Sequence, residues 1–225
     1  MTPPLYEVRD LVCSYQGKKV LGIERLDIAA DGPTAFVGHN GSGKSTLFRA
    51  LAFLLKPESG SLTFLGRPTE GHEELLRRDV TMLLQDPYLL RRSVFENVAY
   101  GLRARGERRG IEDRVAEVLE MVGLSADFAG REWYQLSGGE SRRVTLASRL
   151  VLRTKALLLD EPTANVDEEN GFLIAEAVKN AWLRWGVVPL VASHDLPWLD
   201  EVTDRRVHMK RGRIVEAEVE TDFLL

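Results

Sequence analysis

The chain has 225 residues, enough for one sizeable α/β domain. Hydrophobic residues make up 44% of it, charged residues 28%, and the formal net charge is −4 at pH 7. This balance is typical of a soluble globular protein without overall attraction to nucleic acid. No apolar run approaches the roughly 20 residues of a membrane-spanning helix, and the first ten residues do not resemble a secretion signal. The single cysteine, Cys13, excludes an intramolecular disulfide and fits a reducing compartment.

The first part of the chain predicts strands around one helix. Residues 6–15 and 20–29 alternate apolar and polar side chains, which indicates two strands joined by a turn. Residues 33–38 predict a short buried strand and residues 45–55 an apolar-periodic helix, with a glycine-rich loop between them. Two more strands are expected at 61–66 and 80–85, the second ending at Gln85.

The second part is first helical and then returns to strands. From Asp86 to about Lys155 the pattern is helical, with helices over 93–102 and 111–124 and a third that opens at Ser137. Buried strands over 156–161 and 187–193 flank a helix over 168–185, and residues 205–218 predict a hairpin. We therefore expect one domain, with an α/β core of residues 1–85 and 156–225 and a helical subdomain at about 86–155.

The glycine-rich loop carries the clearest chemistry. Residues 38–46 read GHNGSGKST and match the phosphate-loop pattern G-x-x-x-x-G-K-[ST]. Glycines let backbone N–H groups surround an anion, and the following helix adds its positive end. Lys44 is then expected to pair with the β- and γ-phosphates, Ser45 to ligate Mg²⁺ and Thr46 to contact the α-phosphate. An ordinary glycine-rich turn is the alternative, which the preceding strand and following helix disfavour.

A nucleotide site with Mg²⁺ also needs a carboxylate at the end of a neighbouring strand. Residues 156–161, ALLLDE, supply Asp160 and Glu161 after four apolar residues. Ligands of doubly wound sheets bind at the carboxyl ends of the strands. Asp160 is therefore expected to hold Mg²⁺ and Glu161 to polarise the attacking water as a general base.

A third motif, LSGGE at residues 136–140, allows two interpretations. Ser137 and Glu140 have the spacing of a helix capping box. Two glycines in a first helical turn each cost about 1 kcal/mol relative to alanine, so capping alone does not explain them. A hydroxyl, glycine N–H groups and a helix N-terminus together make a second anion site.

In these motifs the chain resembles the ATP-binding cassette (ABC) family, whose signature is LSGGQ, and the resemblance spans the whole chain in the expected order. It implies a P-loop NTPase core with an N-terminal antiparallel β-subdomain and an inserted α-helical subdomain. GHNGSGKST resembles the Walker A loop, ALLLDE the Walker B strand, and ANVD at 164–167 the D-loop. Gln85 resembles the Q-loop glutamine, His194 the switch histidine, and Tyr15 the aromatic residue that stacks on adenine.

The resemblance assigns site residues one by one. Expected catalytic residues are Glu161, His194, Gln85 and Lys44. Expected metal ligands are Ser45, Gln85 and Asp160. Expected ATP contacts within the chain are Tyr15, Gly38, His39, Asn40, Gly41, Ser42, Gly43, Lys44, Ser45 and Thr46. Expected contacts to the ATP of a partner are Ser137, Gly138, Gly139, Glu140 and Asp167. Glu140 departs from the usual glutamine, and in a capping box it points away from the anion, so we expect activity to survive.

The resemblance further implies an ATPase in which two subunits, copies or paralogues, enclose two Mg²⁺–ATP molecules. We expect transmembrane permease subunits and a substrate-binding protein as partners, no direct contact with nucleic acid, and a place in the cytoplasm on the inner face of the cell membrane. Residues 86–101 are either the surface that docks on the permease or ordinary core packing. In general character, though without a diagnostic motif, residues 89–106 are most similar to import ATPases for oxyanions such as tungstate or molybdate.

The competing function is that of a soluble ABC ATPase in DNA repair or translation. Such proteins usually insert long coiled coils or carry two cassettes in one chain. The short interval between Gln85 and Leu136 leaves no room for a coiled coil, and the net charge is acidic. A nucleotide kinase shares the phosphate loop but does not explain LSGGE. These features favour transport.

Overall fold

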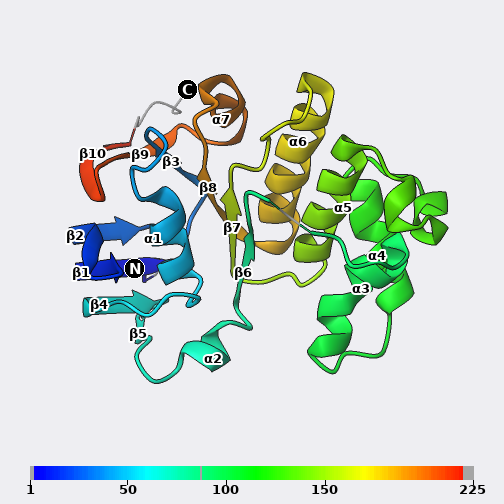
Figure 1. Ribbon diagram of the computed structural model, residues 1–225. Helices are drawn as coiled ribbons and strands as arrows, with labels where there is room; N and C mark the ends of the chain where they lie inside the picture. The colour runs from blue at the N-terminus through cyan, green and yellow to red at the C-terminus, as the bar shows by residue number, and fades with distance from the viewer. Residues whose placement is uncertain (1–2, 87, 220–225) are drawn as a thin grey trace.

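The computed structural model describes residues 3–86 and 88–219, with strands on one side and most helices on the other (Figure 1). A four-stranded antiparallel sheet lies at the N-terminal side, in the order β2-β1-β4-β5. Its strands are β1 (Tyr6–Tyr15), β2 (Lys18–Ile28), β4 (Ser59–Phe64) and β5 (Arg67–Pro68). The expected N-terminal antiparallel subdomain is therefore confirmed.

A six-stranded sheet forms the centre, in the order β10-β9-β3-β8-β7-β6. Five of its strands run parallel, and β10 closes one edge as an antiparallel hairpin with β9. The strands are β3 (Thr34–Val37), β6 (Val80–Leu83), β7 (Ala156–Asp160), β8 (Val188–Ala192), β9 (Arg205–Lys210) and β10 (Arg213–Val219). Such a sheet needs apolar cover on both faces, which explains the continuous apolar runs of β7 and β8.

Strand β7 shows how the two faces are covered. Ala156 and Leu158 point into a core shared with the antiparallel sheet and helix α1 (Lys44–Leu51). Leu157 and Leu159 point the other way, into a core built by helices. Successive side chains of a strand face opposite sides, so one five-residue segment joins both cores.

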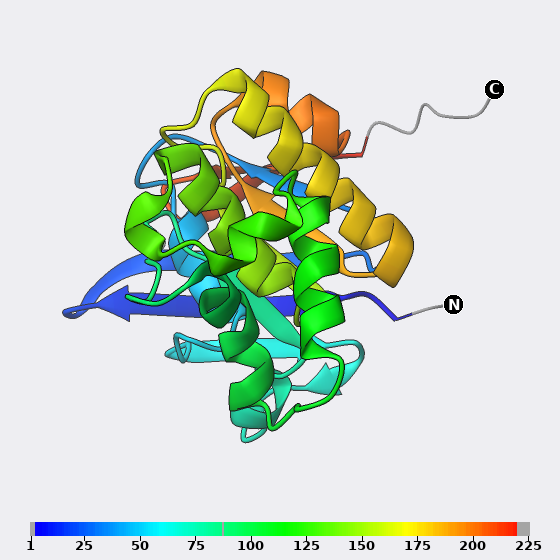
Figure 2. The same cartoon turned by 90° about the vertical axis from the view of Figure 1, so that its right-hand side faces the viewer.

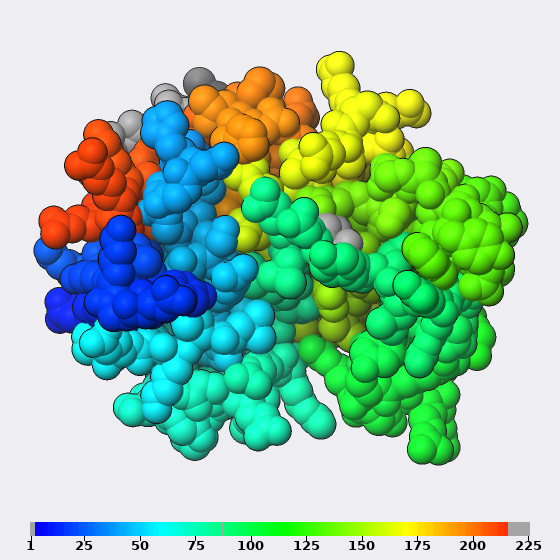
Figure 3. All heavy atoms as spheres, in the orientation of Figure 1, coloured from blue at the N-terminus to red at the C-terminus, as the bar shows by residue number. Residues whose placement is uncertain are grey.

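The helices of the second core come from the middle and the later part of the chain (Figure 2). They are α3 (Val94–Ala104), α4 (Ile111–Met121), α5 (Gly138–Leu150), α6 (Glu168–Trp185) and α7 (Leu196–Val202). Shorter turns are α2 (Glu73–Leu76) and two 3₁₀ segments, Ala126–Gly130 and Trp133–Gln135. Helices α3 to α5 follow β6 and precede β7, as expected for an inserted helical subdomain, and they form a lobe of their own at the right of Figure 3. None of the described helices is long and apolar enough to cross a membrane.

Several local expectations were wrong. The strand expected to end at Gln85 ends at Leu83, and the helical stretch expected from Asp86 begins only at Val94. The two-residue strand β5, the one-turn helix α2 and the seven-residue helix α7 were not predicted, because they are too short for a clear periodicity. The limits set at residues 85/86 and 155/156 stay a prediction.

Candidate active site

The phosphate loop connects β3 to α1 at the carboxyl edge of the central sheet. Gly41 and Gly43 have φ of +77° and +105°, which turns the loop back on itself before the helix begins. Lys44 is only 6% exposed, and its ammonium donates to the carbonyl oxygen of Gly38, 2.5 Å away. The Glu161 carboxylate lies 3.8 Å from this ammonium, and a buried ammonium beside inward-facing loop N–H groups favours a further negatively charged ligand.

The loop lines a pocket of about 350 Å³, within the usual range for small-molecule sites. Gln85, Glu161 and Val20 line the same pocket as the loop, so four separate parts of the sequence meet there. The lining residues are Val20, Asn40, Gly41, Ser42, Gly43, Lys44, Ser45, Thr46, Gln85 and Glu161.

Glu161 is the carboxylate at the centre of this arrangement. It is 6% exposed, and its carboxylate oxygens lie 2.9 Å from Nδ1 of His194 and 3.8 Å from the Lys44 ammonium. The Ser193 hydroxyl donates to the same carboxylate over 3.3 Å. The backbone of Glu161 is left-handed, with φ of +48°, a conformation that costs a non-glycine residue about 1 kcal/mol or more. Surrounding contacts hold this strained residue in place.

Asp160 lies deeper, at the end of β7, and is 2% exposed. Burial raises the pKa of its carboxyl group, against the opposing effects of a hydrogen bond with Ser45 and the charge of Lys44. Its Oδ1 has no hydrogen-bond partner among the described residues. A buried carboxylate oxygen without a partner, beside a serine hydroxyl, is a donor set that fits a Mg²⁺ ion.

Three expected residues lie beside the pocket rather than in its wall. Gly38, His39 and His194 line a neighbouring hollow, and His194 contacts the pocket residue Glu161. Tyr15 ends β1 and is 43% exposed, and its hydroxyl accepts a long hydrogen bond of 3.5 Å from Arg49. The exposed ring at this edge is free to stack on a flat ligand.

The expected trans residues gather at a different place, the N-terminus of α5. Ser137 caps the helix, because its hydroxyl accepts from the Glu140 N–H over 3.2 Å while the Glu140 carboxylate accepts from the Ser137 N–H over 2.7 Å. The capping box is therefore present, and it turns the Glu140 side chain back along the chain. Ser137 and Gly138 remain exposed.

Asp167 lies next to this helix start. It caps α6 by accepting from the N–H of Asn170 over 2.8 Å, and the backbone and side-chain N–H groups of Asn170 lower the pKa of its carboxyl group. The amide of Asn170 also lies against Gly139, where a Cβ atom would meet it at 2.6 Å. Asn170 thus joins Asp167 to the signature segment. Among the described residues, those that line the phosphate pocket include neither Asp167 nor the signature segment.

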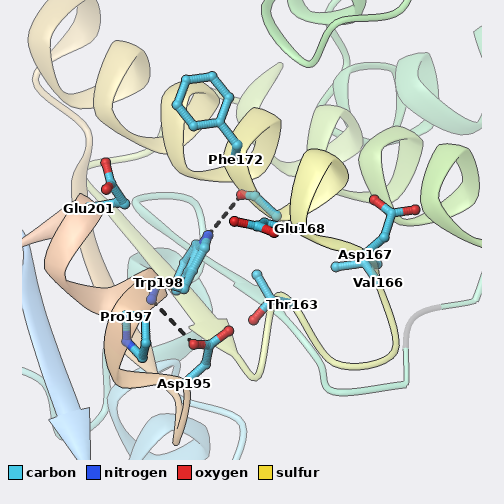
Figure 4. A pocket seen from close by; sticks show the side chains of 10 residues that line it. Thr163, Val166, Asp167, Glu168, Phe172, Asp195, Pro197, Trp198 and Glu201 are labelled. Atoms are coloured by element: carbon cyan, nitrogen blue, oxygen red, sulfur yellow. Dashed lines mark hydrogen bonds between the residues drawn. The ribbon is translucent and has the colours of Figure 1, made fainter.

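A further hollow separates Asp167 from α7, as Figure 4 shows. The indole N–H of Trp198 donates to the carbonyl oxygen of Gly171 over 2.8 Å, and Asp195 caps α7 by accepting from the Trp198 N–H. The first bond connects the segment after His194 to the first turn of α6, and the second stabilises the start of α7. The residues that follow His194 and those that follow Asp167 therefore form one packed unit.

Sequence reasoning missed three residues that hold the site. Ser193 contacts the Glu161 carboxylate, Gly212 donates its N–H to Ser42, and Arg142 donates to the backbone at Glu161. For Arg142 a signal existed, because it lies four and eight residues before the buried Leu146 and Leu150 on the inward side of α5. Nothing in the local pattern pointed to the other two.

Comparison with known proteins now identifies the family. The ABC transporter family model matches residues 24–164. The tungstate uptake system ATP-binding protein TupC of Peptoclostridium acidaminophilum is 34% identical over 94% of this chain and 97% of its own length. TupC of Campylobacter jejuni is 31% identical over 95% of this chain, which spans 64% of that protein. The cell division ATP-binding protein FtsE of Streptococcus pneumoniae is 34% identical over 97% of both chains.

Solved structures agree on the fold. The ATP-binding cassette MJ0796, solved as a dimer in a post-hydrolysis state with ADP and Pi, superposes with a TM-score of 0.87 at 28% identity. That match covers 97% of this chain and all of MJ0796. CbiO1 from Clostridium perfringens, part of the ABC transporter complex cbiONQ, superposes with a TM-score of 0.85 at 30% identity, over 96% of this chain and 88% of its own. This chain, with its complete phosphate loop and buried carboxylates, belongs to the ABC transporter family and is an ATPase.

Proposed function

We propose that this chain is the ATP-hydrolysing subunit of a membrane importer and works as a pair, with a second copy or a paralogue, around two ATP molecules. The observation that carries the proposal is the separation of the expected ATP contacts into two groups. Most of one group lines the phosphate pocket. The other group lies elsewhere, at the start of α5 and at Asp167, where Ser137, Gly138 and Asp167 are exposed. An exposed serine and an exposed glycine at a helix N-terminus suit a phosphate held by another subunit.

Within one subunit, the backbone of residues 38–43 cradles the phosphates and Lys44 neutralises them. Lys44 already has a buried ammonium directed at the loop, so little rearrangement is needed on binding. Thr46 is assigned to the α-phosphate. Tyr15 is assigned to the adenine, since its exposed ring lies at the edge of the antiparallel sheet.

Glu161 is the proposed general base, and His194, 2.9 Å from its carboxylate, orients it and reaches toward the γ-phosphate. Gln85 lines the same pocket as Glu161. Ser45, Asp160 and Gln85 are the residues proposed to hold Mg²⁺, which neutralises charge on the phosphate oxygens when it is bound. ATP binds best when the pair is closed, so binding and hydrolysis alternately close and open it.

The surface proposed to dock on permease subunits lies on the helical subdomain. Five of its apolar or aromatic side chains are at least 38% exposed: Tyr88, Leu90, Tyr100, Trp133 and Tyr134. The two segments that carry them are joined by a hydrogen bond from the Trp133 N–H to the Arg92 carbonyl. Val94 and Val98 of the same region are buried, so this stretch serves both core packing and surface. Clustered exposed aromatic residues are typical of protein interfaces.

The relatives support import of a small oxyanion. Two of them are named for tungstate uptake, and the first aligns along nearly its whole length. We assign tungstate or a similar oxyanion as the transported solute, delivered by a substrate-binding protein, with the ATPase on the inner face of the membrane.

The shared site can be tested by mixing two inactive variants. Lys44→Ala removes the phosphate lysine, and Ser137→Arg blocks the signature of the other half-site. Each alone is expected to lose most ATP hydrolysis. Mixed in equal amounts they should recover about one quarter of the wild-type rate, because half of the pairs are mixed and each mixed pair keeps one intact site. Full hydrolysis by Ser137→Arg alone would contradict the pairing.

The assignment of the base is tested separately. Glu161→Gln keeps the shape of the side chain but cannot accept a proton, so it should bind ATP, hardly hydrolyse it and accumulate as a pair in size-exclusion chromatography with ATP. Normal turnover by this variant would remove Glu161 from the mechanism.

A further inference from the structure

Arg142 lies on the second turn of α5, five residues after the cap Ser137, and only 6% of it is exposed. Its guanidinium donates three hydrogen bonds, all to backbone carbonyl oxygens. Nε donates to Pro162 over 2.8 Å, Nη1 to Gln85 over 2.6 Å, and Nη2 to Glu161. One side chain therefore connects the signature helix to the ends of two neighbouring strands.

These three carbonyls belong to segments that wall the phosphate pocket. Gln85 follows β6, while Glu161 and Pro162 follow β7, and Gln85 and Glu161 both line the pocket. Burial lowers the pKa of Arg142, against the opposing charges of Asp86, Asp160 and Glu161. A planar guanidinium with several fixed donors is suited to such a bridge, and a lysine ammonium is not.

At Glu161 the bridge acts on a strained residue. Its backbone is left-handed, its N–H donates to the Ala192 carbonyl over 2.8 Å, and its C=O accepts from Arg142. The strained residue is thus held on one side by β8 and on the other by α5. If either bond is lost, we expect the strained backbone to relax and the carboxylate to move away from His194.

We propose that Arg142 is a positioning residue, which sets the Glu161 carboxylate and the Gln85 segment for hydrolysis and makes them move together with the signature helix. This inference rests on the proposed role of Glu161 as the base. Arg142 does not line the phosphate pocket in the described part of the chain, so it acts through the backbone of the residues that do.

The test is Arg142→Lys in the purified full-length chain, with kcat, ATP affinity and melting temperature measured together. Lysine keeps the charge but cannot reach three carbonyls, so kcat should fall about 10- to 100-fold, the range expected from a displacement of about 1 Å. ATP affinity should stay within about threefold, because the loop and Lys44 are untouched. Millimolar guanidinium should restore part of the kcat of Arg142→Ala.

Arg114→Lys is the matched control, because Arg114 also donates from its guanidinium to a buried backbone carbonyl, that of Val151. It lies on α4, away from both strand ends, so it should lower the melting temperature without changing kcat. The proposal is overturned if kcat of Arg142→Lys stays within twofold of wild type, or if its loss only follows melting temperature as in the control.

If Arg142→Lys does not fold, Arg142→Gln takes its place, and if neither folds at 25 °C the residue is structural and the proposal fails. Glu161→Gln separates this inference from the proposed function. An inactive Glu161→Gln beside an active Arg142→Lys rejects only the positioning role. A fully active Glu161→Gln rejects the assigned base itself.

Discussion

Replacing Gly212 with alanine should disturb the phosphate loop from the far end of the sequence. Gly212 lies at the tip of the β9–β10 hairpin, donates its N–H to the Ser42 carbonyl over 2.8 Å and accepts from the Gly22 N–H over 2.8 Å. Its φ is +75°, and an added Cβ would lie 2.3 Å from the carbonyl oxygen of Val20. That oxygen belongs to the backbone of β2, so the hairpin tip must move.

The size of the effect follows from these contacts. The left-handed conformation costs alanine about 1 kcal/mol or more, and the two displaced hydrogen bonds are worth about 1 kcal/mol each. A total of about 3 kcal/mol lowers the melting temperature of a chain this long by roughly 6–12 °C. With Ser42 released, the loop must be ordered by the ligand, and ATP affinity should fall about tenfold, or 1.4 kcal/mol.

Gly71→Ala separates backbone strain from the clash. Gly71 has φ of +78°, and no heavy atom lies within 4 Å of its added Cβ among the described residues. It should lose only about 1 kcal/mol of stability and bind ATP normally. Calorimetry and fluorescence titration with a labelled ATP give both quantities for both variants. If Gly212→Ala melts no lower than Gly71→Ala and keeps its ATP affinity, the hairpin does not support the loop.

Single substitutions test three further contacts. Because burial raises the pKa of Asp160, the folded state binds protons more readily and wild-type stability should fall as pH rises through that raised pKa. Asp160→Asn should lack this step, melt a few degrees higher at pH 7 without Mg²⁺ and gain nothing from Mg²⁺; an unchanged pH profile in calorimetry would contradict this. Glu140→Gln keeps the capping box and loses only the 3.8 Å ion pair with Arg131, so unfolding free energy should change by less than about 1 kcal/mol and turnover should persist. Tyr15→Ala should raise the KM for ATP about tenfold through lost stacking, whereas Tyr15→Phe should not.

Long periodic segments were the most predictable part of the fold. The first strand, Tyr6–Tyr15, and the helix Glu168–Trp185 have the expected limits, because each runs through enough residues to show its period. The segment after β6 was not predictable in the same way. Leu84 continues the apolar run, yet Leu84 and Gln85 are both exposed and lie beyond the end of β6 at Leu83.

The residues of the site likewise fall into those that local sequence predicts and those that it does not. Motif residues in one run, such as those of the phosphate loop and the capping box at Ser137, could be predicted because their chemistry depends on neighbours in sequence. Hydrogen bonds that join distant segments of the chain could not be predicted in this way. The bond between Gly212 and Ser42, and the bridge from Arg142 to Glu161, depend on how the sheet is ordered, which no local pattern encodes.

The strand order has a consequence for synthesis of the protein. Strand β3, which leads into the phosphate loop, lies between β8 and β9, two strands that are synthesised some 150 residues or more after it. A nascent chain that has exposed the loop therefore has neither sheet neighbour in place. Pairing of strands that lie so far apart in the sequence is slow. The nucleotide site should therefore form only after the β9–β10 hairpin has left the ribosome. ATP then stabilises only finished molecules, and chains cut before that hairpin should gain no protection from it against proteolysis.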